Sequence, residues 1–461
     1  MNNAWIINTT NRNLNNNNVN NANQVGAVTN LLKTLMTDEQ FFSLLLRIMR
    51  EARRNKRYGK ECAAFELDWV SSLVSMLRAL KEKTYRVDHN YAFLTSVPTW
   101  REIFATSFDG RIADLLLCLP LSPYIEKELH PRTFNNRKRM GAQAAINRVI
   151  DDIYEVSEGY TQPARIIKWD LKGFFPNAVC DIVERGFTGV IDKYQEEIAS
   201  DYGPEMPGFL RWLAMVCVHC YPASHCELRT PRRLWKEHIP PEKSLFSKPP
   251  GKGTPIGRFE SQEGMGLYMN DDVIWLNEEC GIRSTLFMDD CVMVVPERLH
   301  GYALSLFPVL RQRLAAKGVR MNEKKFYDQP YQYGFEFLGS HIKPYRIHIN
   351  NDTFGRATGR VREFNALANK YDYIDALVSS INSYTGILKN RTDFKRLQDL
   401  RRSIAPQWWS MCEWDAMRQC LVCRPGYTIR ERLNKQYNLH LKRHGKSRNS
   451  RPNQCAGVPA A

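Results

Sequence analysis

The sequence predicts an α+β fold, because two short apolar strands stand among long stretches with helical periodicity. The strands are predicted at 165–170 and 284–288, and each apolar run leads to aspartate. Before the first strand, and again from Gly355 onward, apolar residues recur every three or four positions, which is the spacing of one helix face. Strands and helices that occupy separate runs are typical of the α+β class.

The individual elements follow in chain order. Helices are expected before the first strand at 29–48, 65–80, 101–125 and 142–154. After the second strand, the pattern predicts a strand at 291–295, a helix at 304–317, a hairpin at 335–349 and then further helices.

The chain is long and strongly basic. Its 461 residues are enough for two or three subdomains, and 43% hydrophobic residues can supply their cores. The 65 Lys and Arg exceed the 49 Asp and Glu, which gives a net charge of +16. This excess indicates a polyanionic partner such as nucleic acid, although a membrane-surface or ribosome-associated protein could share it.

Membrane insertion is not expected. No stretch reaches the roughly 20 apolar residues of a membrane span, and the best candidate, 112–125, is broken by Asp114, Pro120 and Pro123. The polar N-terminus does not resemble a signal peptide. We therefore expect a cytoplasmic protein whose 12 cysteines are mostly reduced thiols.

Two Cys-x-x-Cys pairs raise the question of a zinc site. Cys217 and Cys220 form the first pair, and Cys420 and Cys423 form the second. A structural zinc site needs four ligands, so the two pairs would have to meet in the fold. Buried free cysteines are the favoured interpretation.

Both ends of the sequence differ from the rest. Asn occupies 12 of the first 23 positions, so residues 1–28 are expected to be disordered. Between Arg424 and Arg451 there are nine Lys or Arg and one acidic residue. Residues 416–461 are predicted to form a basic tail, which is either a solvated segment or a phosphate contact.

Three aspartates point to the chemistry. Asp170 ends the first strand, and Asp289 and Asp290 lie inside the apolar run 286–294. Adjacent carboxylates in apolar surroundings repel each other unless a cation compensates. An Asp-Asp pair alone could equally be a surface hairpin tip, but a third carboxylate at another strand end favours a two-metal site for phosphoryl transfer. Two Mg²⁺ ions are the expected cofactors, and Mn²⁺ could substitute for them.

The residues around these aspartates resemble motifs of reverse transcriptases. Phe-Met-Asp-Asp at 287–290 resembles their aromatic-x-Asp-Asp box, and 170–175 resembles their first catalytic motif. The resemblance implies that the three aspartates are catalytic metal ligands and that the Leu171 carbonyl also faces a metal. It implies, too, that the Phe175 ring excludes the 2′-hydroxyl of a ribonucleotide, whereas Phe175 alone would be interpreted as a core aromatic.

Further motifs follow in the order of the same family. The segment 252–262 resembles the one that packs against the template and the incoming base, and the nucleotide-binding residues assigned there are Ile256, Gly257, Ser261 and Gln262. Lys325 matches the basic catalytic residue near the triphosphate, with Lys324 as its rival. The sequence at Phe337, Leu338 and Gly339 resembles the primer grip.

A basic segment upstream resembles the fingers residues that clamp phosphates. It contains Arg137, Lys138 and Arg139, and the assignment to nucleotide binding falls on Arg137 and Arg139. This segment departs from the commoner Gly-rich spacing of the family.

Departures from the common motifs resemble one subgroup, the enzymes of diversity-generating retroelements. Ile256-Gly257 and Ser261-Gln262 stand where many reverse transcriptases have Gln-Gly and Ser-Pro, and 240–246 and 380–386 also resemble this subgroup. Replacing Gln by Ile removes a hydrogen bond near the nascent base pair, which is a route to error-prone copying. The resemblance to this subgroup implies that the errors fall at adenines. The Asn-rich segment 1–28 resembles a translated template repeat, with a generic disordered tail as the alternative.

The resemblance implies a right-hand polymerase. Its expected parts are the repeat-like segment 1–28, fingers at 29–163, a palm with an antiparallel sheet and flanking helices at 164–354, a helical thumb at 355–415 and the tail at 416–461. The enzyme, bacterial or phage-encoded, would use dNTPs to copy a template-repeat RNA into cDNA for mutagenic retrohoming. A small basic oligomeric accessory protein is the implied partner.

Alternatives of three kinds stay open. The chain could be a retron-type or phage-defence reverse transcriptase, or an RNA-dependent RNA polymerase. It could also be a catalytically silent RNA-binding protein on a polymerase scaffold, although the presence of all three carboxylates argues against that.

Overall fold

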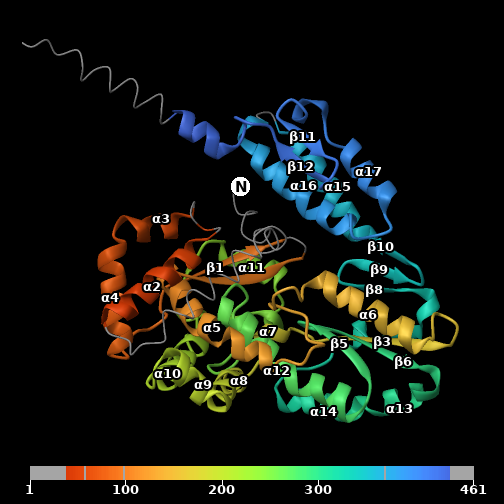
Figure 1. Ribbon diagram of the computed structural model, residues 1–461, viewed down its shortest axis with the longest axis horizontal. Helices are drawn as coiled ribbons and strands as arrows, with labels where there is room; N and C mark the ends of the chain where they lie inside the picture. The colour runs from red at the N-terminus through yellow and green to blue at the C-terminus, as the bar shows by residue number, and fades with distance from the viewer. Residues whose placement is uncertain (1–37, 55, 57–58, 97–98, 368–369, 437–461) are drawn as a thin grey trace, which may run out of the picture. The chain divides into compact units, whose positions relative to one another are not determined.

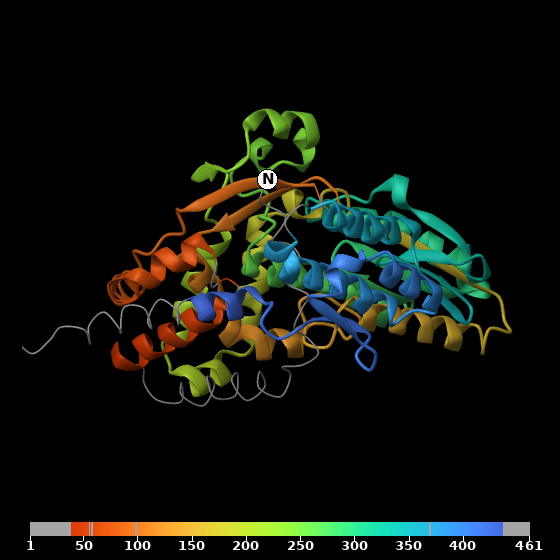
Figure 2. The same ribbon diagram turned by 90° about the horizontal axis from the view of Figure 1, so that it is seen from above.

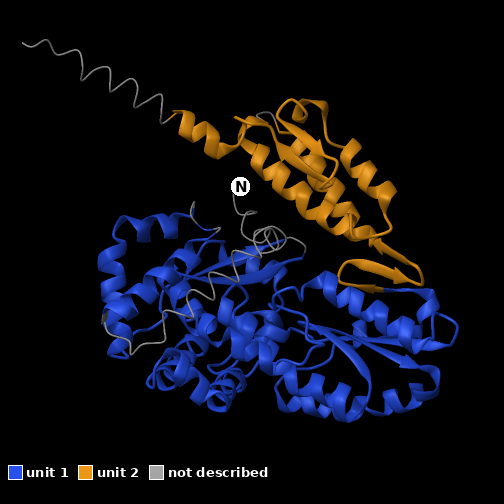
Figure 3. Ribbon diagram, in the orientation of Figure 1, with its two compact units in different colours: residues 1–335 blue, residues 336–461 orange. Residues whose placement is uncertain are grey.

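The computed structural model describes residues 38–54, 56, 59–96, 99–367 and 370–436. The chain divides into two compact units, Met1–Phe335 and Glu336–Ala461 (Figure 3). The predicted segment 1–28 and the end of the predicted tail lie outside the described residues. Each unit has its own buried apolar cluster.

A four-stranded antiparallel sheet lies at the centre of one half of the first unit. Its strand order is β5 (Arg283–Phe287), β6 (Asp290–Pro296), β3 (Ala164–Asp170) and β7 (Tyr327–Pro330). Nearly every residue of β6 is buried, because both faces of the sheet are covered. The strands predicted at 165–170, 284–288 and 291–295 are therefore confirmed, to within one residue at their ends.

Helices cover both sides of this sheet. In Figure 1, α6 (Ala142–Val156) lies on one side, and α13 (His300–Ser305) and α14 (Phe307–Ala316) lie on the other. The helix predicted at 304–317 is in fact two helices that meet at Leu306. Pro308 stands in the first turn of α14, where its missing N–H costs no hydrogen bond, so it can begin a helix but not continue one.

The other half of the first unit is mainly helical. Two long helices, α5 (Phe108–Glu128) and α12 (Phe259–Ile274), contact each other and are largely buried. The remaining helices are α2 (Asp38–Arg53), α3 (Lys60–Leu67), α4 (Trp69–Lys81), α7 (Phe174–Asn177), α8 (Cys180–Lys193), α9 (Gln195–Tyr202), α10 (Met206–Val218) and α11 (Arg232–His238).

A second sheet of the first unit was not predicted. It has the order β2 (Arg101–Thr106), β1 (Asn90–Thr95) and β4 (Cys226–Leu228), and Figure 2 shows its two orange strands beside the green segment that contains α11. The helix predicted at 101–125 was wrong over its first six residues. The strand β2 gains six paired positions and a buried apolar centre against β1, and this tertiary pairing overrides the local helical spacing.

A buried carboxylate attaches the segment 240–246 to this sheet. Glu102 in β2 accepts hydrogen bonds from Trp235 Nε1 (2.7 Å), Ser244 Oγ (2.6 Å) and the Leu245 N–H (2.7 Å). Burial raises the pKa of Glu102, and these three donors oppose the rise. The segment that resembles a subgroup motif is thus held by a side chain far away in sequence.

The second unit combines small sheets with helices. The predicted hairpin at 335–349 consists of three strands in the order β10 (Arg346–Ile349), β9 (Ser340–Lys343) and β8 (Phe335–Phe337). Helices α15 (Asn351–Asn365), α16 (Ile374–Leu388) and α17 (Phe394–Arg402) confirm helical structure beyond 355. A hairpin of β11 (Cys412–Asp415) and β12 (Cys420–Cys423) follows, so ordered structure continues into the segment predicted as tail. Across the described ranges, no helix combines the length and the apolar character that crossing a membrane requires.

Candidate active site

The three aspartates meet at one end of the sheet. Strand β3 ends at Asp170, strand β6 begins at Asp290, and the antiparallel register pairs these two residues directly. Asp289 occupies the turn that joins β5 to β6, and its carbonyl accepts the Leu171 N–H at 3.1 Å. Paired residues of an antiparallel sheet project to the same face, so Asp170 and Asp290 share one.

The turn between β5 and β6 has only two residues. Phe287 pairs with Asp290, which leaves Met288 and Asp289 as the loop. Met288 has φ +57°, a left-handed conformation that most side chains avoid. Its N–H donates to Asn135 Oδ1 at 3.3 Å, so a buried amide from a distant segment holds the turn.

Asp170 is buried and bonded to two residues of the segment that leads into β7. Lys325 Nζ lies 2.6 Å from Asp170 Oδ2, and Asn322 Nδ2 donates to Oδ1 at 3.2 Å. Burial disfavours the charged ammonium of Lys325, but the bond to Asp170 and the field of the three carboxylates outweigh it, so the pKa of Lys325 rises. Both Lys324 and Lys325 are exposed, and it is Lys325 whose ammonium group contacts Asp170.

Asp290 has a lysine partner that the sequence analysis missed. Lys168 Nζ lies 3.4 Å from Asp290 Oδ1. Lys168 stands two residues before Asp170 in a strand that is mostly apolar, and alternate residues of a strand share a face. A charged residue at that spacing was the signal that could have identified it.

Burial and the charges of neighbouring carboxylates weaken the acidity of Asp289 and Asp290. The pKa of Asp289 rises to about 6, first through burial and then through the charges of Asp170 and Asp290. The pKa of Asp290 also rises through burial, partly offset by Lys168. Negative charge at this end of the sheet is therefore destabilising, and the ammonium groups of Lys168 and Lys325 offset part of the destabilisation.

The repulsion gives a stability prediction for Asp289→Asn. The folded-state pKa lies above the unfolded value, so wild type loses stability as pH rises from about 4 to about 6 and stays lower above it. Two pKa units correspond to roughly 3 kcal/mol, and partial exposure reduces the expected gain of the variant to about 1–2 kcal/mol at pH 7.5. Urea unfolding in EDTA at pH 4.5 and 7.5 measures it. A variant that is no more stable than wild type at pH 7.5 would contradict the assigned repulsion.

The donor set fits a divalent cation chemically, although its present arrangement is not that of a metal site. Among the described residues, no group of three or more His, Cys, Asp or Glu side chains has the arrangement of a metal centre. Asp170 and Asp290 instead face Lys325 and Lys168. Three hard oxygen donors that repel one another are nevertheless the ligands Mg²⁺ prefers.

Phe175 lies in the short helix α7, directly after the site. Its carbonyl accepts the Thr254 N–H at 2.9 Å, so α7 and the segment 252–262 are joined through their backbones. The Phe175 ring is half-buried and packs edge-to-face against Phe174. Part of the ring therefore remains accessible, as a contact with a ligand would require.

The segment 252–262 passes close to β2. The Ile256 carbonyl accepts the Phe104 N–H at 2.9 Å. Gly257 has φ +126°, and a Cβ there would lie 2.9 Å from the Phe104 carbonyl oxygen, so only glycine fits. The backbone at these two predicted residues is thereby fixed against the second sheet.

A buried ion cluster fixes the next residue. Arg258 is fully buried and pairs with Asp114 of α5 and with Glu260, whose Oε2 lies 3.2 Å from Nε. It also donates to the Cys217 carbonyl at 3.0 Å and contacts the Cys220 thiol. Burial opposes the charge on Arg258, but the two carboxylates raise its pKa above the usual value.

The other two predicted residues of this segment lie in the first turn of α12. Ser261 is buried, and its hydroxyl donates to Glu260 Oε1 at 2.9 Å, so it supports the ion cluster. Gln262 is partly exposed. The structure thus gives Ser261 an internal partner and leaves Gln262 accessible.

The upstream basic residues separate into two groups. Arg137 is held inside the protein, where it pairs with Glu126 at 2.8 Å and donates to the carbonyls of His130 and Thr133. Lys138 and Arg139 are exposed. Arg139 is therefore the better placed of the two predicted arginines to contact a phosphate.

The predicted primer grip belongs to the second unit, whereas the aspartates belong to the first. Leu338 and Gly339 form the turn between β8 and β9, with φ +48° and +74°. Two successive left-handed residues are the signature of a tight hairpin turn. Phe337 is buried beneath it.

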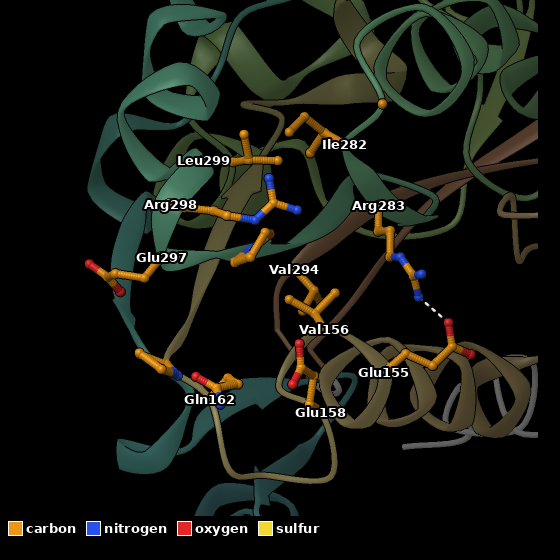
Figure 4. Close-up of a pocket in the computed structure, with 13 residues that line it drawn as sticks. Glu155, Val156, Glu158, Gln162, Ile282, Arg283, Val294, Glu297, Arg298 and Leu299 are labelled. Atoms are coloured by element: carbon orange, nitrogen blue, oxygen red, sulfur yellow. Dashed lines mark hydrogen bonds and ion pairs between the residues drawn. The ribbon is translucent and has the colours of Figure 1, made fainter.

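A pocket lies at the end of the four-stranded sheet opposite the three aspartates (Figure 4). Its volume is about 570 Å³, and Pro163, Val294 and Pro296 are among its lining residues. Pro163 lies seven residues before Asp170, and the register places Pro296 six positions and Val294 four positions from the Asp170–Asp290 pair, which is roughly 14–20 Å along the strands. Arg283 pairs with Glu155 at its rim. The pocket is therefore separate from the carboxylates.

The cysteine pairs do not form a metal centre within the described part of the chain. Cys217 is buried and Cys220 contacts Arg258, whereas Cys420 and Cys423 belong to β12 of the second unit. All cysteines that the structure describes are free thiols.

Comparison with known proteins finds only distant similarity. No protein-family model and no curated protein matches the sequence. Apo telomerase from Candida tropicalis aligns with a TM-score of 0.42 and 10% identity, over 70% of this chain and 60% of that chain. Telomerase from Candida albicans in complex with a TWJ fragment of telomeric RNA aligns with a TM-score of 0.39 and 11% identity, over 71% and 59%. This chain spans less than two thirds of either telomerase chain. The similarity concerns the path of the backbone and not the sequence.

Proposed function

We propose that the chain is an RNA-directed DNA polymerase that extends a primer on an RNA template. The observation that carries the proposal is the pairing of β3 with β6, which sets Asp170 opposite Asp290 with Asp289 in the adjoining turn. The order of the motifs along the sequence supports the same proposal. Contacts within the site support it too, because the segment 252–262 contacts α7 and Lys325 contacts Asp170.

In this proposal, two Mg²⁺ ions bind at the three aspartates, with the Leu171 carbonyl as a further ligand. When bound, the ions would make the primer 3′-hydroxyl more acidic and stabilise the charge on departing pyrophosphate. Cations would compete with Lys168 and Lys325 for the carboxylates, because both lysines offset the same negative charge.

Lys325 is proposed to serve the leaving group. Its raised pKa keeps Nζ protonated at neutral pH, so it can donate a hydrogen bond or a proton to pyrophosphate. Asn322 would keep Asp170 in position when Lys325 turns to the triphosphate, since it contacts the other carboxylate oxygen.

Phe175 is proposed to exclude ribonucleotides. We expect Phe175→Ala to raise the efficiency of rNTP use relative to dNTP use by about 10- to 100-fold, the range that removing one steric conflict in a pocket can give. Single-nucleotide incorporation with matched dNTP and rNTP measures the ratio, and dNTP incorporation by the same variant controls for folding. An unchanged ratio would assign Phe175 to the core alone.

The finer proposal is mutagenic copying of a template-repeat RNA, together with a small basic accessory protein. It rests on the motif forms at Ile256-Gly257 and Ser261-Gln262 and on the Asn-rich segment 1–28. Sequencing of the cDNA should then show errors concentrated opposite adenine. Errors spread evenly over the four bases would favour the retron-type or phage-defence alternative.

The deciding experiment is dNTP incorporation on a primed RNA template, for wild type and for Asp289→Asn/Asp290→Asn. Mg²⁺-dependent cDNA from wild type alone is the expected result. Synthesis by the double variant at the wild-type rate would refute the assignment of the site.

A second candidate is a silent RNA-binding protein on a polymerase scaffold. The observation that favours it is the pairing of Asp170 and Asp290 with lysines, which could replace cations permanently. Such a protein would bind RNA without incorporation in Mg²⁺ or Mn²⁺, even with its native RNA and accessory protein present.

A further inference from the structure

A small pocket lies beside the start of the segment 252–262, the segment whose Thr254 N–H bonds to the Phe175 carbonyl. Its volume is about 220 Å³, and it is formed mainly by the end of α10 and the residues after it, by the segment 245–253, and by the start of α8. The lining residues that matter here are Tyr221, Pro222, Phe246, Lys248, Pro250 and Lys252. Val179 pairs with Lys252 as an isolated bridge, and the Gly253 N–H donates to Ala178, so the pocket wall continues into α7.

The pocket brings two cations together, and the Glu242 carboxylate offsets only part of their mutual repulsion. Lys248 Nζ donates to Asn177 Oδ1 at 2.8 Å, and neither Lys248 nor Lys252 forms an ion pair within the described ranges. Burial lowers the pKa of Lys248, and the charge of Lys252 lowers it further. An anion placed between the two ammonium groups would relieve both effects.

Tyr221, which lines the pocket, has a strained backbone conformation. Its φ is +45°, in the left-handed region that a bulky side chain rarely adopts. Its hydroxyl is buried against the backbone of Gly251 and Lys252.

The remaining wall is flat and apolar. Pro222, Phe246 and Pro250 line it, and the Phe246 ring packs against Phe104 and Trp235, which fixes its orientation. The Arg232 guanidinium lies 4.1 Å from the centre of the Phe246 ring, so a base can stack only on the part of the ring that Arg232 leaves open. An immobilised ring beside lysines is the combination with which proteins bind single-stranded nucleic acid, since bases stack on the ring and phosphates pair with the cations.

We propose that this pocket binds one nucleoside monophosphate unit, with its base against Phe246 and its phosphate at Lys248 and Lys252. The choice of a nucleotide rests on the proposed function, which requires an RNA strand close to α7. The same chemistry could be supplied by a nucleotide of that strand or by a free nucleotide, and competition separates the two.

The test uses the full chain carrying Asp289→Asn/Asp290→Asn, so that binding is measured without synthesis. Single-stranded RNA with 4-thiouridine at one position is irradiated with the protein, and crosslinked peptides are located by mass spectrometry. We expect crosslinks at Tyr221 or Phe246. Adding Lys248→Gln/Lys252→Gln should lower their yield roughly tenfold at low salt, because two phosphate contacts are lost.

Two further variants sharpen the test. Ser224→Trp places a large ring at the exposed mouth of the pocket and should abolish the same crosslinks. Lys60→Gln/Lys81→Gln removes the same charge from exposed positions on α3 and α4 and should leave them unchanged. Thermal melting confirms that each variant is folded.

Each outcome bears on the pocket. Competition by excess AMP assigns the site to a free nucleotide, whereas crosslinks that survive AMP assign it to the RNA strand. Crosslinks only outside the pocket, or a yield at Tyr221 and Phe246 that neither pocket variant lowers, would overturn the proposal. Because no synthesis is involved, a chain that crosslinks here yet fails to incorporate dNTPs would contradict the proposed function alone.

Discussion

Asp170→Asn is expected to lower Mg²⁺-dependent dNTP incorporation by at least about 10³-fold, or roughly 4 kcal/mol in the activation free energy. The amide keeps the size of the side chain and can still bond to Asn322, but it removes the negative charge at the end of β3. It also leaves Lys325 without the carboxylate 2.6 Å away. Single-turnover incorporation on a primed RNA template measures the loss.

A matched control separates charge at the site from charge elsewhere. Asp151→Asn removes one carboxylate from the exposed side of α6 and should leave incorporation unchanged within about twofold. Circular dichroism should show both variants folded. If Asp170→Asn retains a tenth or more of wild-type activity, Asp170 is not a metal ligand of the reaction.

Arg258→Met is expected to cause the largest loss of stability, about 3–5 kcal/mol in the free energy of unfolding. The substitution leaves Asp114 and Glu260 buried at 1–2% exposure without their cation. Burial already raises the pKa of Glu260 well above its usual range, so this carboxyl would take up a proton once the guanidinium is gone. Urea unfolding at pH 7.5 gives the loss.

Two comparisons identify the cause of that loss. Arg311→Met breaks the exposed pair with Glu323 on the surface of α14, and it should cost less than about 1 kcal/mol. Adding Asp114→Asn and Glu260→Gln to Arg258→Met should recover part of the stability, because no buried charge then remains unpaired. Without such recovery, lost packing rather than unpaired charge is the main effect.

The sequence was most informative where a local pattern and the tertiary structure agree. Ile166, Ile167 and Trp169 are buried in β3, as an apolar run before a carboxylate predicts. The run 286–294 likewise became β5, a turn and β6, since aspartates in the middle of an apolar stretch favour a turn. The three aspartates could therefore be assigned to one end of a sheet before the structure was known.

Partners that arrive from distant segments could not be predicted in this way. The polar residues that hold the site, Asn322 on Asp170 and Asn135 on the Met288 turn, have no periodic signal. Arg137 was assigned to phosphate, yet Glu126 and two carbonyls use its guanidinium. The strand β2 was predicted as helix because its pairing partner β1 is specified only by the fold.

The pairing of β3 with β6 also sets which changes in length the chain can tolerate. Seven consecutive pairs run from Ala164–Pro296 to Asp170–Asp290. Adding or removing one residue within either strand would turn Asp170 and Asp290 to opposite faces, because side chains alternate. Insertions near Lys56 or Gly426 change no pairing in this sheet. Among natural relatives of this chain, the two strands should therefore keep constant length while their apolar residues exchange freely, and variation in length should accumulate in the connections.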